Sequence, residues 1–272
     1  RKAIEELEDY MGITIDAIVP IELAGANTSA AVAAASEMGK MVLNGDYTGR
    51  AIPEIQQTTP YLQGKKITPI SSVDEWGNVC FIKDATNYRV AERLGKLISA
   101  GAYGLAGQAG FVLSGKEAKD LLVKNTMTEC HDLGVLIRTA QEDRADPVAR
   151  ILTSLGGWEI LRGTLVNIDD EDRIGYYWGT HTIAGSGDDD GREAKVWFKN
   201  EHHVCWVDDE PVVTSPDIIV IVERATGEPV PNPLAKVGME VSILAFPSRP
   251  DPSRRFADSG RCRGARRPPR RR

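Results

Sequence analysis

The sequence has few of the features that usually reveal the class of a protein. Cysteine is scarce, and the four thiols lie 50, 75 and 57 positions apart, at Cys80, Cys130, Cys205 and Cys262. This spacing matches neither a zinc framework nor a dense disulfide scaffold, so we expect buried free thiols. Apolar runs are short, and the charged segment from Arg1 to Tyr10 contains no signal-peptide core. These absences predict a soluble, cytoplasmic protein without a membrane segment.

Motifs of several enzyme classes are missing as well. The sequence has no Gly-x-Ser-x-Gly elbow and no Cys-His pair marked by local sequence, so covalent catalysis has no specific support. His131 and His181 are isolated. His202 and His203 would point to opposite faces of a strand, so one metal ion could not easily bind both. The acidic Asp188-Asp189-Asp190 lacks the ligand spacing of a calcium loop, and we predict a hairpin tip there.

Charge is divided unevenly along the chain. The segment from Arg249 to Arg272 has ten arginines against Asp251 and Asp258, a net charge of +8, whereas the other residues have 23 Lys/Arg and 37 Asp/Glu, a net charge of −14. Such a tail is typical of an arm that binds nucleic acid. An all-arginine tail among Gly, Ala, Pro and Ser also arises when a GC-rich gene is translated out of frame, and we favour this origin. Either origin predicts disorder.

Alternating strand and helix signals predict an α/β domain over residues 1–156, with a mainly parallel sheet. We expect strands at 15–20, 41–43, 79–82 and 105–113, and helices at 1–10, from Thr28 or Ser29 to Gly39, and at 88–101, 115–124 and 126–140. Asp146-Pro147 then begins a short helix that stops at Gly156-Gly157. We place the domain boundary at this double glycine.

After this boundary the sequence pattern favours β-strands. We predict a smaller β-rich domain over 157–247, followed by the tail at 248–272. Its expected strands are 158–168, 174–184, 194–199, 203–207, 218–223 and 239–246, and its expected turns are 169–172, 185–191, 208–210 and 226–229. The predicted fold class is therefore α+β overall.

The strongest candidate site is the segment from Asn44 to Gln56. It follows the apolar Met41 to Leu43, and Gly45 and Gly49 mark a sharply turning connection. In an α/β sheet, ligands bind beyond the carboxyl ends of the strands. We therefore expect polar groups of this segment to face a ligand.

The residue types in this segment suit proton transfer or ion binding. Asp46 and Glu54 are acceptors that could ligate a divalent metal or take a proton, Arg50 could hold a carboxylate in bidentate fashion, and Gln56 could match an amide edge. The structural alternative is a loop in which Arg50 pairs with Asp46 or Glu54 to hold its own shape.

A second polar segment, Pro20 to Asn27, follows the preceding predicted strand. Glu22 would face the same crevice as Asp46 if the two strands are neighbours, and the helix N-terminus near Asn27 could receive an anionic group. The glycine spacing fits neither GxGxxG nor GxxxxGK[ST], which argues against a nucleotide cofactor here. Alternatively, Glu22 is a solvated loop charge and Asn27 a plain helix cap.

Several stretches together resemble the S-methyl-thiohydantoin desulfurase family, a former domain of unknown function found beside hydantoinase and oxoprolinase subunits. These stretches are Ile15–Glu22, Gly49–Gln56, Gly156-Gly157 with Arg162–Val166, Phe198–Glu201, Pro216–Ile219, Thr226–Pro229 and Gly238–Val241. The resemblance spans about residues 5–250. Family members have a further α/β stretch ahead of the region matching Arg1, and here the arginine tail replaces the family's C-terminal sequence. The resemblance therefore implies a fragment.

The family implies hydrolytic removal of sulfur from a thiohydantoin ring. Asp46 and Glu54 would then serve as base or metal ligand, Arg50 would orient a substrate carboxylate, and Asn27 and Gln56 would hydrogen-bond the ring amide. The remaining expected substrate-binding residues are Glu22, Asn200 and Glu201.

One alternative function is a non-catalytic accessory subunit of a hydantoinase or oxoprolinase assembly, with the β domain as its docking surface. It predicts co-purification with a larger enzyme and no intrinsic turnover. Self-association is also expected if the missing stretch leaves apolar sheet surface exposed. Nucleic-acid binding through the arginine tail is the least favoured reading.

Overall fold

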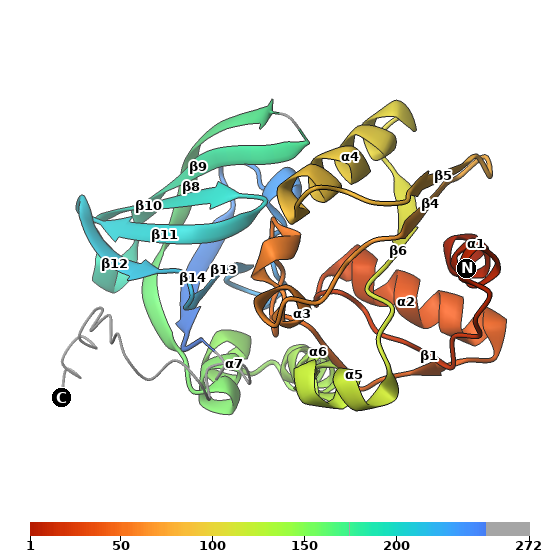
Figure 1. Ribbon diagram of the computed structural model, residues 1–272. Helices are drawn as coiled ribbons and strands as arrows, with labels where there is room; N and C mark the ends of the chain where they lie inside the picture. Colours follow the sequence, from red (N-terminus) through yellow and green to blue (C-terminus); the bar gives the residue numbers. More distant parts are fainter. Residues whose placement is uncertain (174, 249–272) are drawn as a thin grey trace. The chain divides into compact units, whose positions relative to one another are not determined.

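The computed structural model describes residues 1–173 and 175–248, which form two compact units (Figure 1). Unit 1 extends from Arg1 to Glu129, and the described part of unit 2 begins at Cys130. The division falls inside helix α6 (Thr126–Glu142). Apart from Ser248, the predicted tail at 248–272 lies outside the described residues. The predicted boundary at Gly156-Gly157 stays a prediction.

Unit 1 contains short strands and helices in mixed order. In chain order these are α1 (Lys2–Met11), β1 (Ala17–Ile18), α2 (Gly25–Met38), β2 (Met41–Val42), β3 (Gly45–Asp46), η1 (Ile55–Gln57), α3 (Thr59–Leu62), β4 (Ile70–Asp74), β5 (Val79–Ile82), α4 (Tyr88–Gly101), β6 (Ala106–Ala109), α5 (Gly115–Leu121) and β7 (Val123–Lys124).

The mainly parallel sheet predicted for this part of the chain is wrong. Only β1 and β2 pair in parallel, whereas β3 pairs antiparallel with β7, and β4 pairs antiparallel with both β5 and β6. For β4 and β5 the reason lies in the short turn after Asp74, whose carboxylate accepts the backbone N–H groups of Trp76 and Asn78. So short a connection can only reverse the chain, because a parallel pair needs a crossover of about a dozen residues or more.

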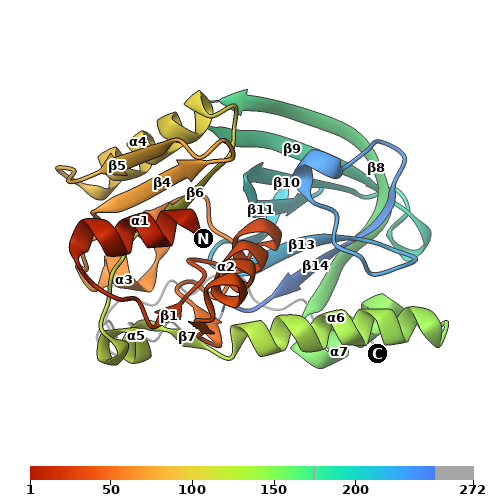
Figure 2. The same ribbon diagram turned by 90° about the vertical axis from the view of Figure 1, so that its right-hand side faces the viewer.

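Helices α1 and α4 cover opposite faces of the β5-β4-β6 sheet (Figures 1 and 2). Tyr10 of α1 stacks on Phe81 with ring centroids 4.8 Å apart, whereas Gly95 of α4 lies against Gln108, whose amide donates to the Ser72 hydroxyl. Because neighbouring residues of a strand point to opposite faces, the Phe81 contact with α1 and the Gln108 contact with α4 lie on opposite faces of the sheet. The α4 face encloses an apolar core of Ile67, Ile70, Ile82, Ala91 and Phe111.

Local sequence signals predicted correctly where α5 and α7 begin, but not where α2 begins. The capping box of Ser114 and Glu117 begins α5, and Asp146 with Pro147 begins α7 (Pro147–Leu155). The expected cap of α2 at Thr28 or Ser29 is wrong, because that helix begins at Gly25. The Thr28 hydroxyl instead accepts the Ala24 N–H at 3.2 Å.

Unit 2 consists mainly of one antiparallel sheet that curls into a half-barrel (Figure 2). Its strand order is β12-β11-β10-β9-β8-β14-β13. The strands are β8 (Trp158–Arg173), β9 (Tyr176–Gly185), β10 (Glu193–Lys199), β11 (Glu201–Val207), β12 (Glu210–Thr214), β13 (Ile218–Glu223) and β14 (Glu240–Phe246), with short helices η2 (Gly187–Asp189) and η3 (Asn232–Leu234).

The turn expected at residues 169–172 is wrong. Strand β8 continues to Arg173, which pairs with Tyr176 of β9. The four acidic residues look like a turn in sequence, but each has a cross-strand partner on β9 and remains exposed, so their charges stay in water. Cross-strand pairing therefore overrides the local turn signal here.

The two faces of the curled sheet bury different clusters. The inner face is filled by residues such as Leu161, Ile183 and Val196, all fully buried. The outer face of β13 and β14 packs Val222 and Leu244 against the apolar sides of α6 and α7.

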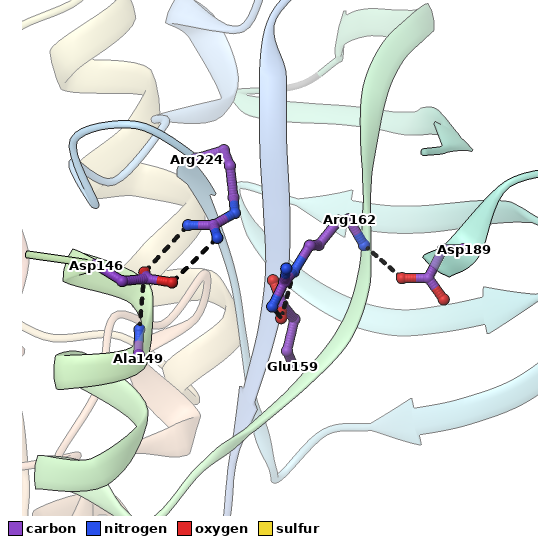
Figure 3. Close-up of polar contacts among 6 residues, drawn as sticks. All are labelled: Asp146, Ala149, Glu159, Arg162, Asp189 and Arg224. Atoms are coloured by element: carbon purple, nitrogen blue, oxygen red, sulfur yellow. Dashed lines mark hydrogen bonds and ion pairs between the residues drawn. The ribbon is translucent and has the colours of Figure 1, made fainter. Parts of the chain in front are cut away.

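In unit 2, Asp146 and Arg162 each make several polar contacts (Figure 3). The Asp146 carboxylate accepts the Ala149 N–H at 3.1 Å, which caps α7, and two guanidinium N–H groups of Arg224 at 3.1 and 3.0 Å. Burial alone would raise the pKa of Asp146, but the Arg224 and Ala149 donors outweigh it and lower the pKa. On β8, the Arg162 guanidinium binds Glu159 while its backbone N–H donates to Asp189.

The expectation of buried free thiols is confirmed for Cys205 and is wrong for Cys80 and Cys130. Cys80 and Cys130 are exposed, and Cys205 is buried within the inner face of the half-barrel. Burial raises the pKa of the Cys205 thiol to about 12. Cys262 lies outside the described residues. Among the described helices, none is both long and apolar enough to cross a lipid bilayer.

Candidate functional site

The two candidate segments of unit 1 follow the two strands of the parallel pair. Ile18 of β1 pairs with Val42 of β2, so the chain leaves both strands at the same edge. Beyond that edge, the Tyr47 N–H donates to the Ile21 carbonyl at 3.3 Å. The strand-end rule therefore brings Glu22 and Asp46 together even though this sheet has only two strands.

Asp46 is fully buried, and its carboxylate has four donors. Oδ2 accepts the backbone N–H groups of Thr48 at 3.1 Å and Gly49 at 2.8 Å and the Thr48 hydroxyl at 2.8 Å, while Oδ1 accepts the Thr126 hydroxyl at 3.0 Å. Gly49 has a φ of 72°, a left-handed conformation that glycine adopts without strain. Asp46 thus fixes the turn that follows β3 and joins it to the start of α6.

Glu22 is also buried, with 7% of its surface exposed, but it has fewer donors. Oε1 accepts the Asn27 amide at 2.5 Å, and Oε2 accepts the Ile52 N–H. Burial raises the pKa of Glu22 above its usual value, and the negative charge of Asp46 adds to this rise. The Ile52 N–H, the Asn27 amide and the charge of Lys96 oppose the rise without cancelling it. A buried carboxyl with a raised pKa is a common feature of catalytic sites.

The other predicted residues of this segment lie just before helix η1 or within it. The Thr48 hydroxyl donates to the Arg50 carbonyl, and the Arg50 Nε donates to the Ala51 carbonyl at 3.1 Å. Glu54 is half-buried and accepts the Gln56 amide at 2.5 Å. Glu54 and Gln56 therefore form one hydrogen-bonded pair at the start of η1.

Two residues on α4 belong to this site and were missed by the sequence analysis. The Glu92 carboxylate accepts the Ile55 N–H at 3.1 Å, so it holds the same loop that Glu22 holds at Ile52. Lys96 follows Glu92 by one helical turn, and its charge acts on Glu22. The only sequence signal was the spacing of two oppositely charged residues four apart on a helix that also contains Arg89 and Arg93.

Asn200 and Glu201, predicted to bind substrate, lie in unit 2 at the turn between β10 and β11. Asn200 has a left-handed φ of 59°, and it exchanges two hydrogen bonds with the Tyr177 backbone, at 2.7 and 2.9 Å. Its carbonyl accepts the Asn232 amide at 2.6 Å. Glu201 of β11 is the strand-register partner of Lys199 of β10, on the other side of the turn. These contacts give Asn200 a clear part in shaping the turn, and the substrate-binding role of both residues stays a prediction.

The four histidines lie in unit 2, on α6, β9 and β11. His202 Nδ1 lies 3.1 Å from the Ile219 carbonyl, while His203 Nδ1 lies 3.0 Å from the Ser215 hydroxyl. His181 is fully buried beside Phe198, and His131 is exposed on α6. Within the part of the chain that the structure describes, no group of three or more His, Cys, Asp or Glu side chains could hold a metal ion.

The fold and the site define a two-unit α+β protein with a carboxylate-rich site in its first unit. Two family models match consecutive parts of the chain: the S-Me-THD-like N-terminal domain matches residues 1–84, and the S-Me-THD-like C-terminal domain matches residues 85–254. The chain belongs to this family, the S-methyl-thiohydantoin desulfurase family indicated by the sequence motifs.

The fold also has a counterpart among solved structures. A crystal structure of a protein from Chromobacterium violaceum superposes with a TM-score of 0.73 and 19% sequence identity, over 94% of this chain and 73% of that chain. At this level of identity the likeness concerns the fold alone. No similar protein was found among proteins with curated descriptions.

Proposed function

We propose that this protein hydrolyses an S-methyl-thiohydantoin, or a closely related cyclic amide, and releases its sulfur as a thiol. Family membership over nearly the whole chain supports the substrate class. The observation that carries the reaction type is Glu22, a buried carboxyl with a raised pKa that is held by only two donors. Such a group can take a proton from water near neutral pH more readily than an ordinary surface carboxylate.

The reaction needs one water molecule and no oxidant or reductant. A base takes a proton from water while the oxygen attacks the ring carbon that bears sulfur, which gives a tetrahedral intermediate. The C–S bond then breaks as the ring carbonyl forms, and the methylthiolate leaves with a proton as methanethiol. The other product is the hydantoin. The protein must therefore supply a base, a proton donor and hydrogen bonds to the ring.

We assign these roles to the residues around Glu22. Glu22 acts as the base, and Glu54, expected from the sequence to be catalytic, serves as the second acid-base group, on the loop that Glu22 holds at Ile52. Arg50 orients a carboxylate of the substrate, and the amides of Asn27 and Gln56 bind the ring. Asp46 was also expected from the sequence to be catalytic, and its four donors support instead a role in holding the loop in place.

Replacement of Glu22 tests this proposal directly. Glu22→Gln keeps the shape and removes the base, so kcat for methanethiol release should fall by about 100-fold or more. Glu75→Gln is the matched control, because Glu75 is exposed in the turn between β4 and β5, and its activity should equal that of the parent. Turnover by a folded Glu22→Gln protein at the parental rate would refute the assignment.

A further inference from the structure

Glu54 lies between two backbone N–H groups that are held by carboxylates of other elements. The Ile52 N–H, two residues before Glu54, donates to Oε2 of Glu22. The Ile55 N–H, directly after Glu54, donates to Oε2 of Glu92 on α4 at 3.1 Å. The short segment that carries Glu54 is therefore fixed on both sides by side chains from outside it.

Ile55 is also the first residue of helix η1, so Glu92 supplies an acceptor for the start of that helix. The first N–H groups of any helix need partners from outside it. Glu54 occupies the N-cap position of η1, yet within the described chain its side chain makes no capping hydrogen bond to this helix. Its carboxylate accepts the Gln56 amide at 2.5 Å, and its carbonyl accepts the Gln57 N–H at 3.0 Å. Glu92 thus serves the start of η1, while the Glu54 carboxylate is directed to Gln56.

Helix α4 can carry this acceptor because other contacts fix it against the same segment. Ala91, next to Glu92, is buried in the apolar core against which Ile55 packs. One turn before Glu92, Tyr88 packs edge-on against Tyr61 of α3, with ring centroids 4.4 Å apart, and α3 follows η1 directly in the chain. The hydrogen bond from Ile55 is therefore one of several contacts that hold α4, η1 and α3 together.

We propose that Glu92 is a positioning residue for Glu54: by holding the Ile55 N–H, it fixes the backbone from which the Glu54 carboxylate reaches the substrate. This inference rests on the proposed function for the role of Glu54 in proton transfer. A displacement of about 1 Å at a reacting group can lower a rate by about 100-fold. The contact itself is a property of the protein without substrate, so the contact and the chemistry can be tested separately.

The first test separates the hydrogen bond of Glu92 from its charge. Glu92→Met keeps the length and the helix propensity of the side chain but removes the carboxylate acceptor. The kcat for methanethiol release by the full chain should fall by about tenfold or more, with KM within about threefold of the parental value. Glu92→Gln keeps an acceptor oxygen, so its kcat should recover to within about threefold of the parent. Glu37→Met, at an exposed position of α2, is the control and should match the parent.

Two results of this test would overturn the proposal. The first is a parental kcat in folded Glu92→Met, whether or not KM rises. The second is a kcat as low in Glu92→Gln as in Glu92→Met, because the acceptor for the Ile55 N–H would then not be what matters. If Glu92→Met does not fold, Glu92→Ala is measured in its place.

The second test does not depend on activity. The hydrogen-exchange rate of the Ile55 amide is measured by NMR in the full chain without substrate. Loss of the charged acceptor should speed this exchange by about tenfold or more in Glu92→Met, whereas Glu92→Gln and Glu37→Met should stay near the parental rate. An unchanged rate in folded Glu92→Met would refute the positioning role, whether or not thiohydantoins are turned over. Faster exchange in Glu92→Met, together with a parent that turns over no thiohydantoin, would confirm the contact and refute the proposed function.

Discussion

At the residue scale, Asp46 and Glu22 are two buried carboxylates held in different ways. Asp46 has four donors, whereas Glu22 has two and feels the charge of Asp46. A buried carboxylate with many donors is a stable structural anchor, because each of its oxygens is satisfied. One with few donors keeps acceptor capacity for a water or a substrate. This contrast is why Glu22, rather than Asp46, is our proposed base.

The anchoring role of Asp46 can be tested through Thr126. Thr126→Val removes the hydroxyl that donates to Oδ1 and leaves that buried oxygen without this partner. We expect the free energy of unfolding to fall by about 1–3 kcal/mol. Urea unfolding measures this change, and Thr14→Val, at an exposed position, should shift stability by less than about 0.5 kcal/mol. Equal stability of both variants would show that the bond to Asp46 is not structural.

Part of this site was predictable from the sequence. The apolar strand before Asn44 and the polar turn after it indicated Asp46, and the strand-end rule related Asp46 to Glu22. Glu92 and Lys96 were not predictable in the same way, because they come from a helix about 70 residues after Glu22 in the chain. Their relevance depends on the packing of Ile21 and Ile55 against α4, which no local pattern encodes.

At the scale of elements, close approach of strands constrains the half-barrel at Gly163. A Cβ added at this position would lie 1.9 Å from the Ala184 carbonyl oxygen and 2.7 Å from its carbon. Both atoms belong to the backbone of β9, so no side-chain movement can relieve the clash. The pair of β8 and β9 therefore requires glycine here.

Gly163→Ala should consequently destabilise unit 2 strongly. We expect a loss of about 2 kcal/mol or more in the free energy of unfolding, or a failure to fold. Gly115→Ala is the matched control, because nothing lies within 4 Å of an added Cβ at the start of α5. That change should be neutral or slightly stabilising. Thermal unfolding followed by circular dichroism compares the two, and similar melting temperatures would contradict the constraint.

Elements with strong local signals were predictable, and those that depend on partners were not. The capping box at Ser114 and the Asp146-Pro147 pair gave the starts of α5 and α7, because these bonds form within one helical turn. Strand β4 was missed. Its two serines interrupt the apolar pattern, and they are buried only because β5 and β6 flank them. Strand direction likewise depends on pairing and was misassigned in unit 1.

At the scale of the whole molecule, His181 makes stability depend on pH. It is fully buried in unit 2 beside Phe198 and His202, and burial lowers its pKa from 6.5 to about 4. As pH falls below about 6.5, the unfolded chain takes up the proton before the folded protein does. Stability is therefore complete above this pH and declines between about 6.5 and 4.

The size of this effect follows from the shift. We expect a loss of the order of 2–3 kcal/mol across the interval. His181→Leu should abolish that part of the acid sensitivity, and His131→Leu should not, because His131 is exposed. Urea unfolding at pH 7, 5.5 and about 4.5 measures the dependence. Identical pH profiles for the parent and His181→Leu would show that this histidine does not set acid stability.

The central proposal, hydrolysis at the carbon that bears sulfur, is tested most directly with isotopically labelled water. The full chain is incubated with S-methyl-thiohydantoin in ¹⁸O-water, and methanethiol and hydantoin are quantified together by mass spectrometry. We expect equal amounts of both products and one ¹⁸O atom in the new ring carbonyl, beyond the exchange seen in a control with hydantoin alone. Absence of methanethiol, or hydantoin without the label, would contradict the proposed reaction.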